Sequence, residues 1–393
     1  MKVLWINDMA NFTGGAETYI YQSAQVLHDN YGVENLLLYS VDSKIDLQYA
    51  KVFSFSSVVA DIKEQINLIQ PDLVYVHQVQ SKETLEQLSE IDIPVVGFVH
   101  DHKNFCLREH KYTVIGNNTC TEKVSNGCYS CLGFLNKKNS FPYVSFKNIQ
   151  NVLDVQDTLK RFDHMIVASG YMHEHLLLHS FEDTRISTIP LFSSNINNTE
   201  YSINISKEKR FLFVGQLIRG KGVDTLLDAF FQIRHLNVAL DICGDGRQRA
   251  ELEKFADKLG LSHKVFFHGK VSSDDLSAYY ENTYAVVVPS RAPETFNLVG
   301  LEAMKHSKAV IATDVGGIRE WLEDGLTGYL FPSNDVNRLG NILEDALSNP
   351  QSISRMGQRG YIRYSEKFTP AQHCSQLYTL LSSLVKTRRC HAA

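Results

Sequence analysis

The chain lacks several features that would assign it to a common class of protein. Its 39 lysines and arginines are outnumbered by 44 aspartates and glutamates, a net charge of −5, which is poorly suited to neutralising the phosphates of a nucleic acid. No apolar stretch approaches the length of a membrane-spanning helix. The N-terminus has neither the apolar region nor the cleavage site of a signal peptide. We therefore expect a cytoplasmic protein with reduced thiols and no nucleic-acid partner, associated with the inner face of the membrane at most peripherally.

The length and the residue pattern predict two α/β domains. At 393 residues the chain exceeds what one hydrophobic core usually supports. Short apolar runs alternate with amphipathic segments throughout, as in doubly wound parallel sheets with helices on both faces. Strands are expected at Val3–Asn7, Asn35–Tyr39, Leu73–His77, Val95–His100, Met165–Ala168, Phe211–Gly215, Ala239–Cys243, Val265–His268, Ala285–Val288 and Ala309–Thr313. Helices are expected at Glu17–His28, Ala60–Ile69 and Lys82–Leu88, with a closing helix at about Pro370–Lys386.

A polar, Asn/Ser-rich stretch, Phe192–Asn204, predicts the boundary between the two domains. We expect Rossmann-like domains at residues 1–195 and 206–369, the first with a cysteine-containing loop over residues 102–143. A C-terminal helix and tail at residues 370–393 can cross back onto the rest of the chain. Ligands of doubly wound sheets bind at the carboxyl ends of the strands, so the active site is expected in the cleft across which the two domains face each other.

The most informative segment runs VPSRAPETFNLVGLEAM, from Val288 to Met304. Two glutamates, Glu294 and Glu302, flank a turn between an apolar run and a helical pattern. The free N–H groups of a helix N-terminus favour an anion such as phosphate, and carboxylates accept hydrogen bonds from sugar hydroxyls. This combination indicates a site for a nucleoside diphosphate-sugar, although two solvated acids on a surface helix could have the same spacing.

Three further turns of the second half have residues suited to a nucleotide. Within Phe213–Gly222, Lys221 lies at an expected helix start, where an ammonium can neutralise a leaving diphosphate, and Arg219 lies close by. A solvated loop with two cations is the alternative. The segments Asp241–Gly246 and Thr313–Gly317 each end a strand in a glycine-rich turn with room for a ligand, or form an ordinary strand–helix turn.

The first half has its own candidate residues at the ends of expected strands. Gly14 and Gly15 precede a helix and let the backbone approach a phosphate, or form a plain turn. They are not part of a GxGxxG dinucleotide-binding fingerprint, so the sequence does not favour an enzyme that transfers hydride from a dinucleotide. His100 follows a strand and could donate to a sugar hydroxyl or a developing charge. A buried structural role is the alternative for His100, and His77, at the end of another strand, has the same two interpretations.

Four of the seven cysteines lie in the long loop, at Cys106, Cys120, Cys128 and Cys131. The last two form a CxxC pair, and a reduced compartment favours metal binding over a disulfide. We predict a structural zinc site with these four thiolates as ligands. An iron–sulfur cluster and four unligated thiols are the alternatives.

Together these motifs resemble the family-4 retaining glycosyltransferases of GT-B fold, the glycosyl transferases of group 1. The resemblance covers nearly the whole chain and is densest over Val214–Phe331. The matching segments are Gly14–Glu17, His100–Asp101, Val214–Phe230, Cys243–Gly246, Phe267–Leu276, Pro289–Met304 and Ala312–Phe331. The implied activity is metal-independent transfer of a sugar from a nucleoside diphosphate, UDP or GDP, to a glycan, lipid-linked or small-molecule acceptor held mainly by the N-terminal domain. Cell-surface polysaccharide or glycoconjugate synthesis is the implied setting.

The resemblance also implies a role for each matching residue. Glu302 would hold the ribose hydroxyls, Lys221 would offset the charge of the leaving diphosphate, and His100 would contact the donor sugar near the reacting carbon. Glu294 would bind the transferred sugar. The backbone positions assigned to the donor are Gly14, Gly15, Gly244, Thr295, Phe296, Asn297 and Leu298. No side chain is implied as a nucleophile, so a front-face displacement assisted by the leaving diphosphate is expected.

One residue departs from the family pattern. Gln216 stands where members usually have arginine, and a neutral amide cannot neutralise a diphosphate. We expect Arg219 to substitute for that arginine. Two other functions fit the same motifs: a sugar-nucleotide epimerase of the same fold, which needs no acceptor, and a non-catalytic sugar-nucleotide binding protein.

Overall fold

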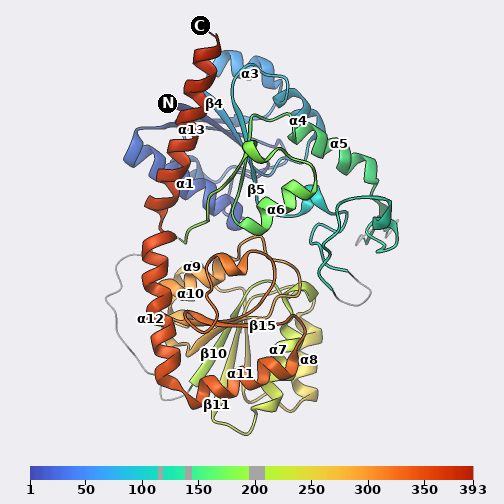
Figure 1. Ribbon diagram of the computed structural model, residues 1–393, viewed down its shortest axis with the longest axis vertical. Helices are drawn as coiled ribbons and strands as arrows, with labels where there is room; N and C mark the ends of the chain where they lie inside the picture. The colour runs from blue at the N-terminus through green and yellow to red at the C-terminus, as the bar shows by residue number, and fades with distance from the viewer. Residues whose placement is uncertain (114–117, 138–143, 194–208, 393) are drawn as a thin grey trace. The chain divides into compact units, whose positions relative to one another are not determined.

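The computed structural model describes residues 1–113, 118–137, 144–193 and 209–392, and the chain divides into two compact units (Figure 1). The first unit contains Met1–His110, Thr121–Ser194 and Pro370–Ala393. The second contains Lys111–Cys120 and Asn195–Thr369. Most of the stretch expected to separate the domains, residues 194–204, lies outside the described residues. The segment Lys111–Cys120 packs with the second unit, although the sequence-based boundaries put it in the first.

The described part of the first unit contains a seven-stranded sheet in the order β3-β2-β1-β4-β5-β8-β9, in which each pair of neighbours is parallel. Every residue of β4, β5 and β8 is buried, as expected for strands of a parallel sheet covered on both faces. The strands are β1 (Lys2–Asn7), β2 (Glu34–Tyr39), β3 (Phe55–Val58), β4 (Leu73–Val76), β5 (Val95–Val99), β8 (His164–Val167) and β9 (Ile186–Thr188). A separate antiparallel pair joins β6 (Leu135–Lys137) to β7 (Val144–Phe146).

Most helices of the first unit start at a side chain that caps their first N–H groups. Asp61, Ser81 and Ser169 each accept a hydrogen bond from a backbone N–H of the first turn that follows. The helices are α1 (Gly15–Tyr31), α2 (Leu47–Ala50), α3 (Ile62–Ile69), α4 (Lys82–Leu88), α5 (Ile149–Leu159) and α6 (Gly170–Leu178). Within the described residues, no helix of either unit is both long enough and apolar enough to cross a membrane.

The second unit contains a parallel sheet in the order β12-β11-β10-β13-β14-β15. Its strands are β10 (Lys209–Val214), β11 (Val238–Cys243), β12 (Val265–Gly269), β13 (Ala285–Val288), β14 (Ala309–Thr313) and β15 (Gly328–Phe331). Its helices are α7 (Val223–Gln232), α8 (Arg249–Lys258), α9 (Ser273–Asn282), α10 (Leu298–Lys305), α11 (Val336–Ser348) and α12 (Pro350–Lys367). A buried cluster of strand and helix side chains, among them Phe211, Leu240 and Leu343, forms its core.

The closing helix, α13 (Pro370–Ala392), returns to the first unit and runs beside α1 (Figure 1). The rings of Tyr31 and Tyr378 stack with centroids 4.3 Å apart. Near the start of α13, Nδ1 of His373 donates to the carbonyl of Pro190 at 2.7 Å, and its Nε2 accepts from the hydroxyl of Tyr19 at 3.0 Å. The expectation of a C-terminal helix that crosses back is confirmed.

The buried His373 predicts a loss of stability in mild acid. Burial lowers the pKa of His373 to about 4, although the bond to Pro190 acts in the opposite direction. Between pH 6.5 and pH 4, His373 is therefore protonated in the unfolded chain but not in the folded chain. The free energy of unfolding keeps its full contribution from His373 above pH 6.5 and loses it as the pH falls. The free energy of unfolding should fall between pH 7 and pH 4.5 by about 2 kcal/mol less in His373→Gln than in the wild-type protein. Urea unfolding of both proteins at the two pH values measures this. An unchanged difference would contradict this assignment.

Candidate functional site

The candidate site of the second unit lies where its strand order changes direction. From the central pair β10 and β13, the sheet extends through β11 and β12 on one side and through β14 and β15 on the other. Ligands of such sheets bind at the carboxyl ends of the strands around this point. The loop after β10 contains Lys221, in a short 3₁₀ turn (Arg219–Lys221), and the loop after β13 contains Glu294. The fold therefore brings together two residues that are 73 positions apart.

Lys221 and Glu294 form a partly buried ion pair. The ammonium of Lys221 donates to Oε1 of Glu294 at 2.7 Å, and the side chains are 28% and 14% exposed. The hydroxyl of Ser290 donates to the same oxygen at 2.5 Å. Burial opposes ionisation of Glu294, but the Lys221 charge and hydrogen bonds from Lys221, Ser290 and Asn297 outweigh it, so the pKa of Glu294 is lowered. At neutral pH the site holds a carboxylate beside an ammonium.

The N-terminus of α10 follows Glu294 directly. Asn297 has a φ of 75° and caps the helix, its side chain accepting from the N–H of Gly300 at 3.2 Å. The carbonyl of the buried Phe296 accepts from Nε1 of Trp321 at 2.7 Å, which fixes the turn before the helix. These hydrogen bonds fix the turn Thr295–Leu298 in front of the first N–H groups of α10. The sequence predicted a helix start at this position as the anion site.

Glu302 lies in the middle of α10, where Oε2 accepts a hydrogen bond from the hydroxyl of Tyr280 at 2.7 Å. Burial raises the pKa of Glu302, although the bond from Tyr280 and the charge of Lys305 act in the opposite direction. The carboxylate is held in one orientation by the bond from Tyr280. A fixed, poorly solvated carboxylate gains more than an exposed one from new hydrogen-bond donors such as hydroxyls.

Two glycines allow the loops of this site to approach one another. Gly222 has a φ of 68°, and a Cβ there would lie 2.0 Å from the carbonyl oxygen of Pro289. Gly316 has a φ of 58°, and a Cβ would lie 2.1 Å from the carbonyl oxygen of Glu294. Only glycine tolerates both the left-handed backbone and these contacts. The loops after β10, β13 and β14 therefore meet backbone to backbone around Glu294.

Arg291 is a residue of this site that the sequence reasoning passed over. Its side chain is buried and links the loop after β13 to the start of α7, with Nη1 2.8 Å from Asp224 and Nη2 2.5 Å from the hydroxyl of Thr225. Its backbone N–H donates to the carbonyl of Gly220 at 2.8 Å. Arg291 thus braces the turn that presents Lys221. The one arginine in the turn between β13 and α10 was the signal that the sequence offered.

The remaining predicted residues of the second unit lie on the same edge of the sheet. Gln216 and Arg219, both in the loop that follows β10, are exposed. Gly244 follows β11, and its N–H donates to the carbonyl of Gly269 at 2.7 Å.

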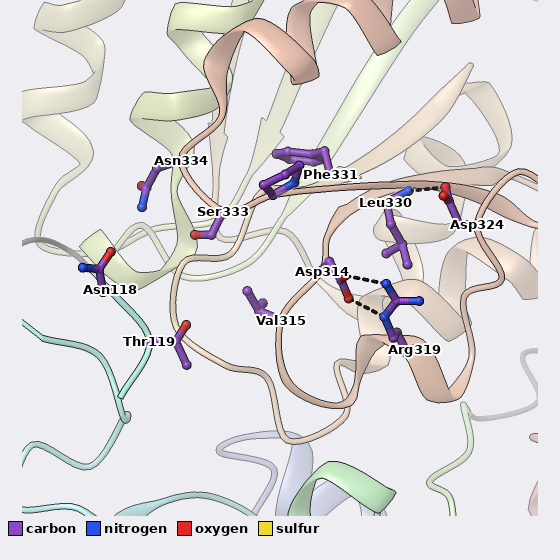
Figure 2. A pocket seen from close by; sticks show the side chains of 11 residues that line it. Asn118, Thr119, Asp314, Val315, Arg319, Asp324, Leu330, Phe331, Ser333 and Asn334 are labelled. Carbon is purple, nitrogen blue, oxygen red and sulfur yellow. Dashed lines mark hydrogen bonds and ion pairs between the residues drawn. The ribbon is translucent and has the colours of Figure 1, made fainter. Parts of the chain in front are cut away.

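A polar pocket of about 530 Å³ lies at the carboxyl ends of β14 and β15 (Figure 2). Asp314 and Arg319 form an ion pair on its wall, at 2.5 Å, and Asn118 and Thr119 of the Lys111–Cys120 segment approach from the opposite side. The hydroxyl of Thr119 donates to the carbonyl of Arg291 at 3.3 Å. The predicted turn Thr313–Gly317 therefore borders both this pocket and, through Gly316, the Glu294 loop.

In the first unit, His77 and His100 lie together at the ends of β4 and β5. Nδ1 of His77 is 2.9 Å from Nε2 of His100. Burial lowers the pKa of His100 to about 3 and that of His77 well below 6.5, so both rings are neutral at pH 7. Both line a second pocket of about 530 Å³ that also includes Asp101, Lys103 and Lys147.

The glycines Gly14 and Gly15 occupy the position that the sequence predicted. Gly14 is the N-cap of α1, Gly15 is its first residue, and both are exposed. Glu17, in the first turn, is buried and accepts a long hydrogen bond, 3.5 Å, from the Asn7 amide at the end of β1.

Among the described residues, the four loop cysteines form no disulfide, and all are partly buried: Cys106, Cys120, Cys128 and Cys131. Cys120 belongs to the second unit and the other three to the first. In the part of the chain that the structure describes, no group of three or more His, Cys, Asp or Glu side chains is placed to hold a metal ion.

Zinc nevertheless stays a prediction of the sequence, and elemental analysis of the purified protein tests it. A Zn(Cys)₄ site would give about one equivalent of zinc per chain. Less than about half an equivalent of both zinc and iron would remove the metal hypothesis and leave the thiols unligated.

Comparison with known proteins agrees with this geometry. The family model of the glycosyl transferases group 1 matches residues 196–363. An uncharacterized glycosyltransferase of Methanocaldococcus jannaschii, MJ1178, is 30% identical over 253 residues, which are 62% of this chain and 68% of that protein. The lipopolysaccharide 1,2-N-acetylglucosaminetransferase of Salmonella typhimurium is 33% identical over 162 residues, 36% of this chain and 42% of that protein. This chain therefore belongs to the glycosyl transferases of group 1.

A solved structure shows the same architecture. Anabaena Alr3699/HepE, solved in complex with UDP, superposes with a TM-score of 0.75 at 20% sequence identity, covering 98% of this chain and 100% of that chain. The two parallel α/β units are those of a GT-B glycosyltransferase. The expected fold class is confirmed.

Proposed function

We propose that this protein is a family-4 retaining glycosyltransferase that moves a sugar from a nucleoside diphosphate to an acceptor. The observation that carries the proposal is the Lys221–Glu294 pair at the start of α10, with Glu302 in the same helix. A uracil nucleotide is the donor we favour, because HepE has been solved with UDP and also with UDP-glucose. A guanine nucleotide is the second choice.

The donor diphosphate is proposed to bind Lys221 and the first N–H groups of α10. Both supply positive charge where negative charge develops on the leaving diphosphate, without a metal ion. When the diphosphate also pairs with Lys221, Glu294 can accept hydrogen bonds from the hydroxyls of the transferred sugar. Glu302 accepts hydrogen bonds from the ribose hydroxyls, oriented by Tyr280.

The transfer step is proposed to proceed on one face of the sugar. Glu294 is engaged with Lys221 and Ser290 and serves to bind sugar, so it is not assigned as a nucleophile. The bond from the anomeric carbon to the diphosphate breaks as the acceptor oxygen bonds to the same face, and the departing diphosphate takes the acceptor proton. Retention of configuration follows from attack on the face that the leaving group occupied.

The acceptor is proposed to bind the pocket of the first unit that His77 and His100 line. Its polar side chains, among them Asp101 and Lys103, suit a hydroxylated ligand. His100 contacts the donor sugar near the reacting carbon, and the backbone at Gly14 and Gly15 approaches the diphosphate. The likeness to a lipopolysaccharide glycosyltransferase supports a role in cell-surface polysaccharide or glycoconjugate synthesis, with lipid-linked acceptors reached at the inner face of the membrane.

A ligand screen followed by a reaction time course tests the proposal. Thermal stabilisation by UDP, GDP, ADP and their sugars identifies the donor, because binding to the folded state raises the melting temperature. The NMR time course of that donor then separates the three functions. Conversion of the donor with no acceptor indicates an epimerase, binding without turnover over any acceptor panel indicates a binding protein, and acceptor-dependent release of nucleoside diphosphate supports transfer.

The exposed Arg219 is predicted to compensate for Gln216. We expect Arg219→Ala to raise the KM for the donor about tenfold, because one charge-assisted contact to the diphosphate is lost. Introducing arginine by Gln216→Arg in the Arg219→Ala background should restore the KM. If Arg219→Ala left turnover and donor affinity unchanged while Lys221→Ala abolished them, the compensation would be disproved.

A further inference from the structure

The two histidines of the first unit form a pair whose proton positions are restricted by their surroundings. His77 follows β4 and His100 follows β5, neighbouring strands of the sheet. Nδ1 of His77 and Nε2 of His100 are 2.9 Å apart, so one ring donates and the other accepts. The roles in this contact decide which nitrogen of His100 has the proton.

The side chain of His77 is held in one orientation by aromatic rings. It stacks on Trp5 with the planes at 5° and the centroids 5.3 Å apart, and its centroid is 4.3 Å from that of Tyr75. Only 8% of the residue is exposed. Because the ring cannot turn without disrupting these contacts, the two nitrogens keep distinct environments.

The second nitrogen of His77 determines the direction of the hydrogen bond. Nε2 of His77 is buried and makes no hydrogen bond to any described residue. A proton there would be a buried N–H with no acceptor, which is costlier than a bare nitrogen that accepts nothing. The favoured arrangement puts the proton of His77 on Nδ1, from which it reaches Nε2 of His100.

We propose that His77 is a positioning residue that donates from Nδ1 to Nε2 of His100 and so fixes His100 in its Nδ1–H tautomer. Nε2 of His100 is then occupied as an acceptor. His100 therefore does not act as a base through Nε2. The tautomer assignment stands on the geometry alone, and its consequence for sugar transfer rests on the proposed function.

Long-range ¹H–¹⁵N correlation spectra of the ¹⁵N-histidine-labelled full-length protein at pH 7.5 test the tautomer. Histidine-specific variants assign the His77 and His100 rings among the 15 histidines. We expect the wild-type spectrum to show a protonated Nδ1 and a bare Nε2 for both rings. A protonated Nε2 on His100 in the wild-type protein would overturn the proposal whether or not any variant folds.

Two substitutions at His77 separate the hydrogen bond from the packing. His77→Phe keeps a ring against Trp5 but removes the donor, so His100 should show a protonated Nε2. His77→Asn loses the stacked ring but places an amide N–H near the position of Nδ1, so the wild-type tautomer of His100 should return. An unchanged His100 spectrum in His77→Phe would contradict the proposal.

The same variants connect the tautomer to the reaction. With the donor identified by thermal shift, His77→Phe should lower kcat about tenfold at an unchanged KM for the donor, and His77→Asn should restore most of it. Equal kcat values for the three proteins would refute the consequence for catalysis. If the spectra agree with the prediction but no nucleotide-sugar binds or turns over, the proposed function fails and the tautomer assignment stands.

Discussion

Lys221→Ala is expected to lower the rate of sugar transfer by on the order of 10³-fold, because one preorganised cation at a developing charge contributes a factor of this size. In the proposed site the ammonium of Lys221 lies next to the leaving diphosphate and the N-terminus of α10, with Arg219 as a second cation. The effect should appear mainly in kcat, since the charge on the diphosphate grows as the bond to the sugar breaks. Initial rates with saturating donor and acceptor measure it.

A structural effect of the same substitution has to be separated from the catalytic one. Removing Lys221 leaves Glu294 without its ammonium partner, and with both side chains partly exposed the cost to the free energy of unfolding is about 1–2 kcal/mol. The double variant Lys221→Met with Glu294→Gln removes both charges and should recover most of that stability without recovering the rate. A Lys221→Ala protein with near wild-type kcat would exclude Lys221 from the chemistry.

Glu302→Ala is expected to weaken UDP binding on the order of 30–100-fold, because two hydrogen bonds from ribose hydroxyls to a carboxylate are lost. The hydroxyl of Tyr280, which is buried, donates to Glu302 at 2.7 Å and orients this carboxylate. Tyr280→Phe is the matched control, since it keeps the carboxylate and removes only the bond that orients it. Isothermal titration with UDP measures both variants.

The control should lose less than about tenfold in affinity, because the carboxylate remains available to the ribose. Equal losses in Tyr280→Phe and Glu302→Ala would mean that the nucleotide senses the packing around α10 and not the carboxylate itself. Wild-type affinity in Glu302→Ala would remove Glu302 from the ribose site.

The central strands of the two large sheets were predictable from the sequence, but three of their four edge strands were not. The apolar runs at Val95–His100 and Ala309–Thr313 correspond to buried strands, β5 and β14. In the two large sheets, the strands that escaped prediction are β3, β9 and β15, all at sheet edges, and the separate pair β6 and β7 was also missed. The sequence of β3, FSSV, has no continuous apolar run, and β9 has only three residues, so neither gives the periodic signal of a central strand.

The sequence indicated the loops that contain Lys221 and Glu294, but not that these two residues form a pair. The order of motifs indicates the loops after β10 and β13, yet only the strand order makes these loops neighbours and brings Lys221 against Glu294. The same holds for His77 and His100, which are 23 positions apart. Arg291 was invisible for a different reason: an arginine in a turn usually lies in solvent, and its burial follows from Asp224, Thr225 and Asn334 packing around it.

A crystal structure of the protein with UDP tests the central claim most directly. The account predicts the diphosphate within hydrogen-bond distance of Nζ of Lys221 and of the backbone N–H of Leu298, with the ribose hydroxyls on the carboxylate of Glu302. Under this account the 2.7 Å contact between Lys221 and Glu294 lengthens or is shared with a phosphate oxygen. UDP bound away from α10, or bound with neither Lys221 nor Glu302 in contact, would contradict the account.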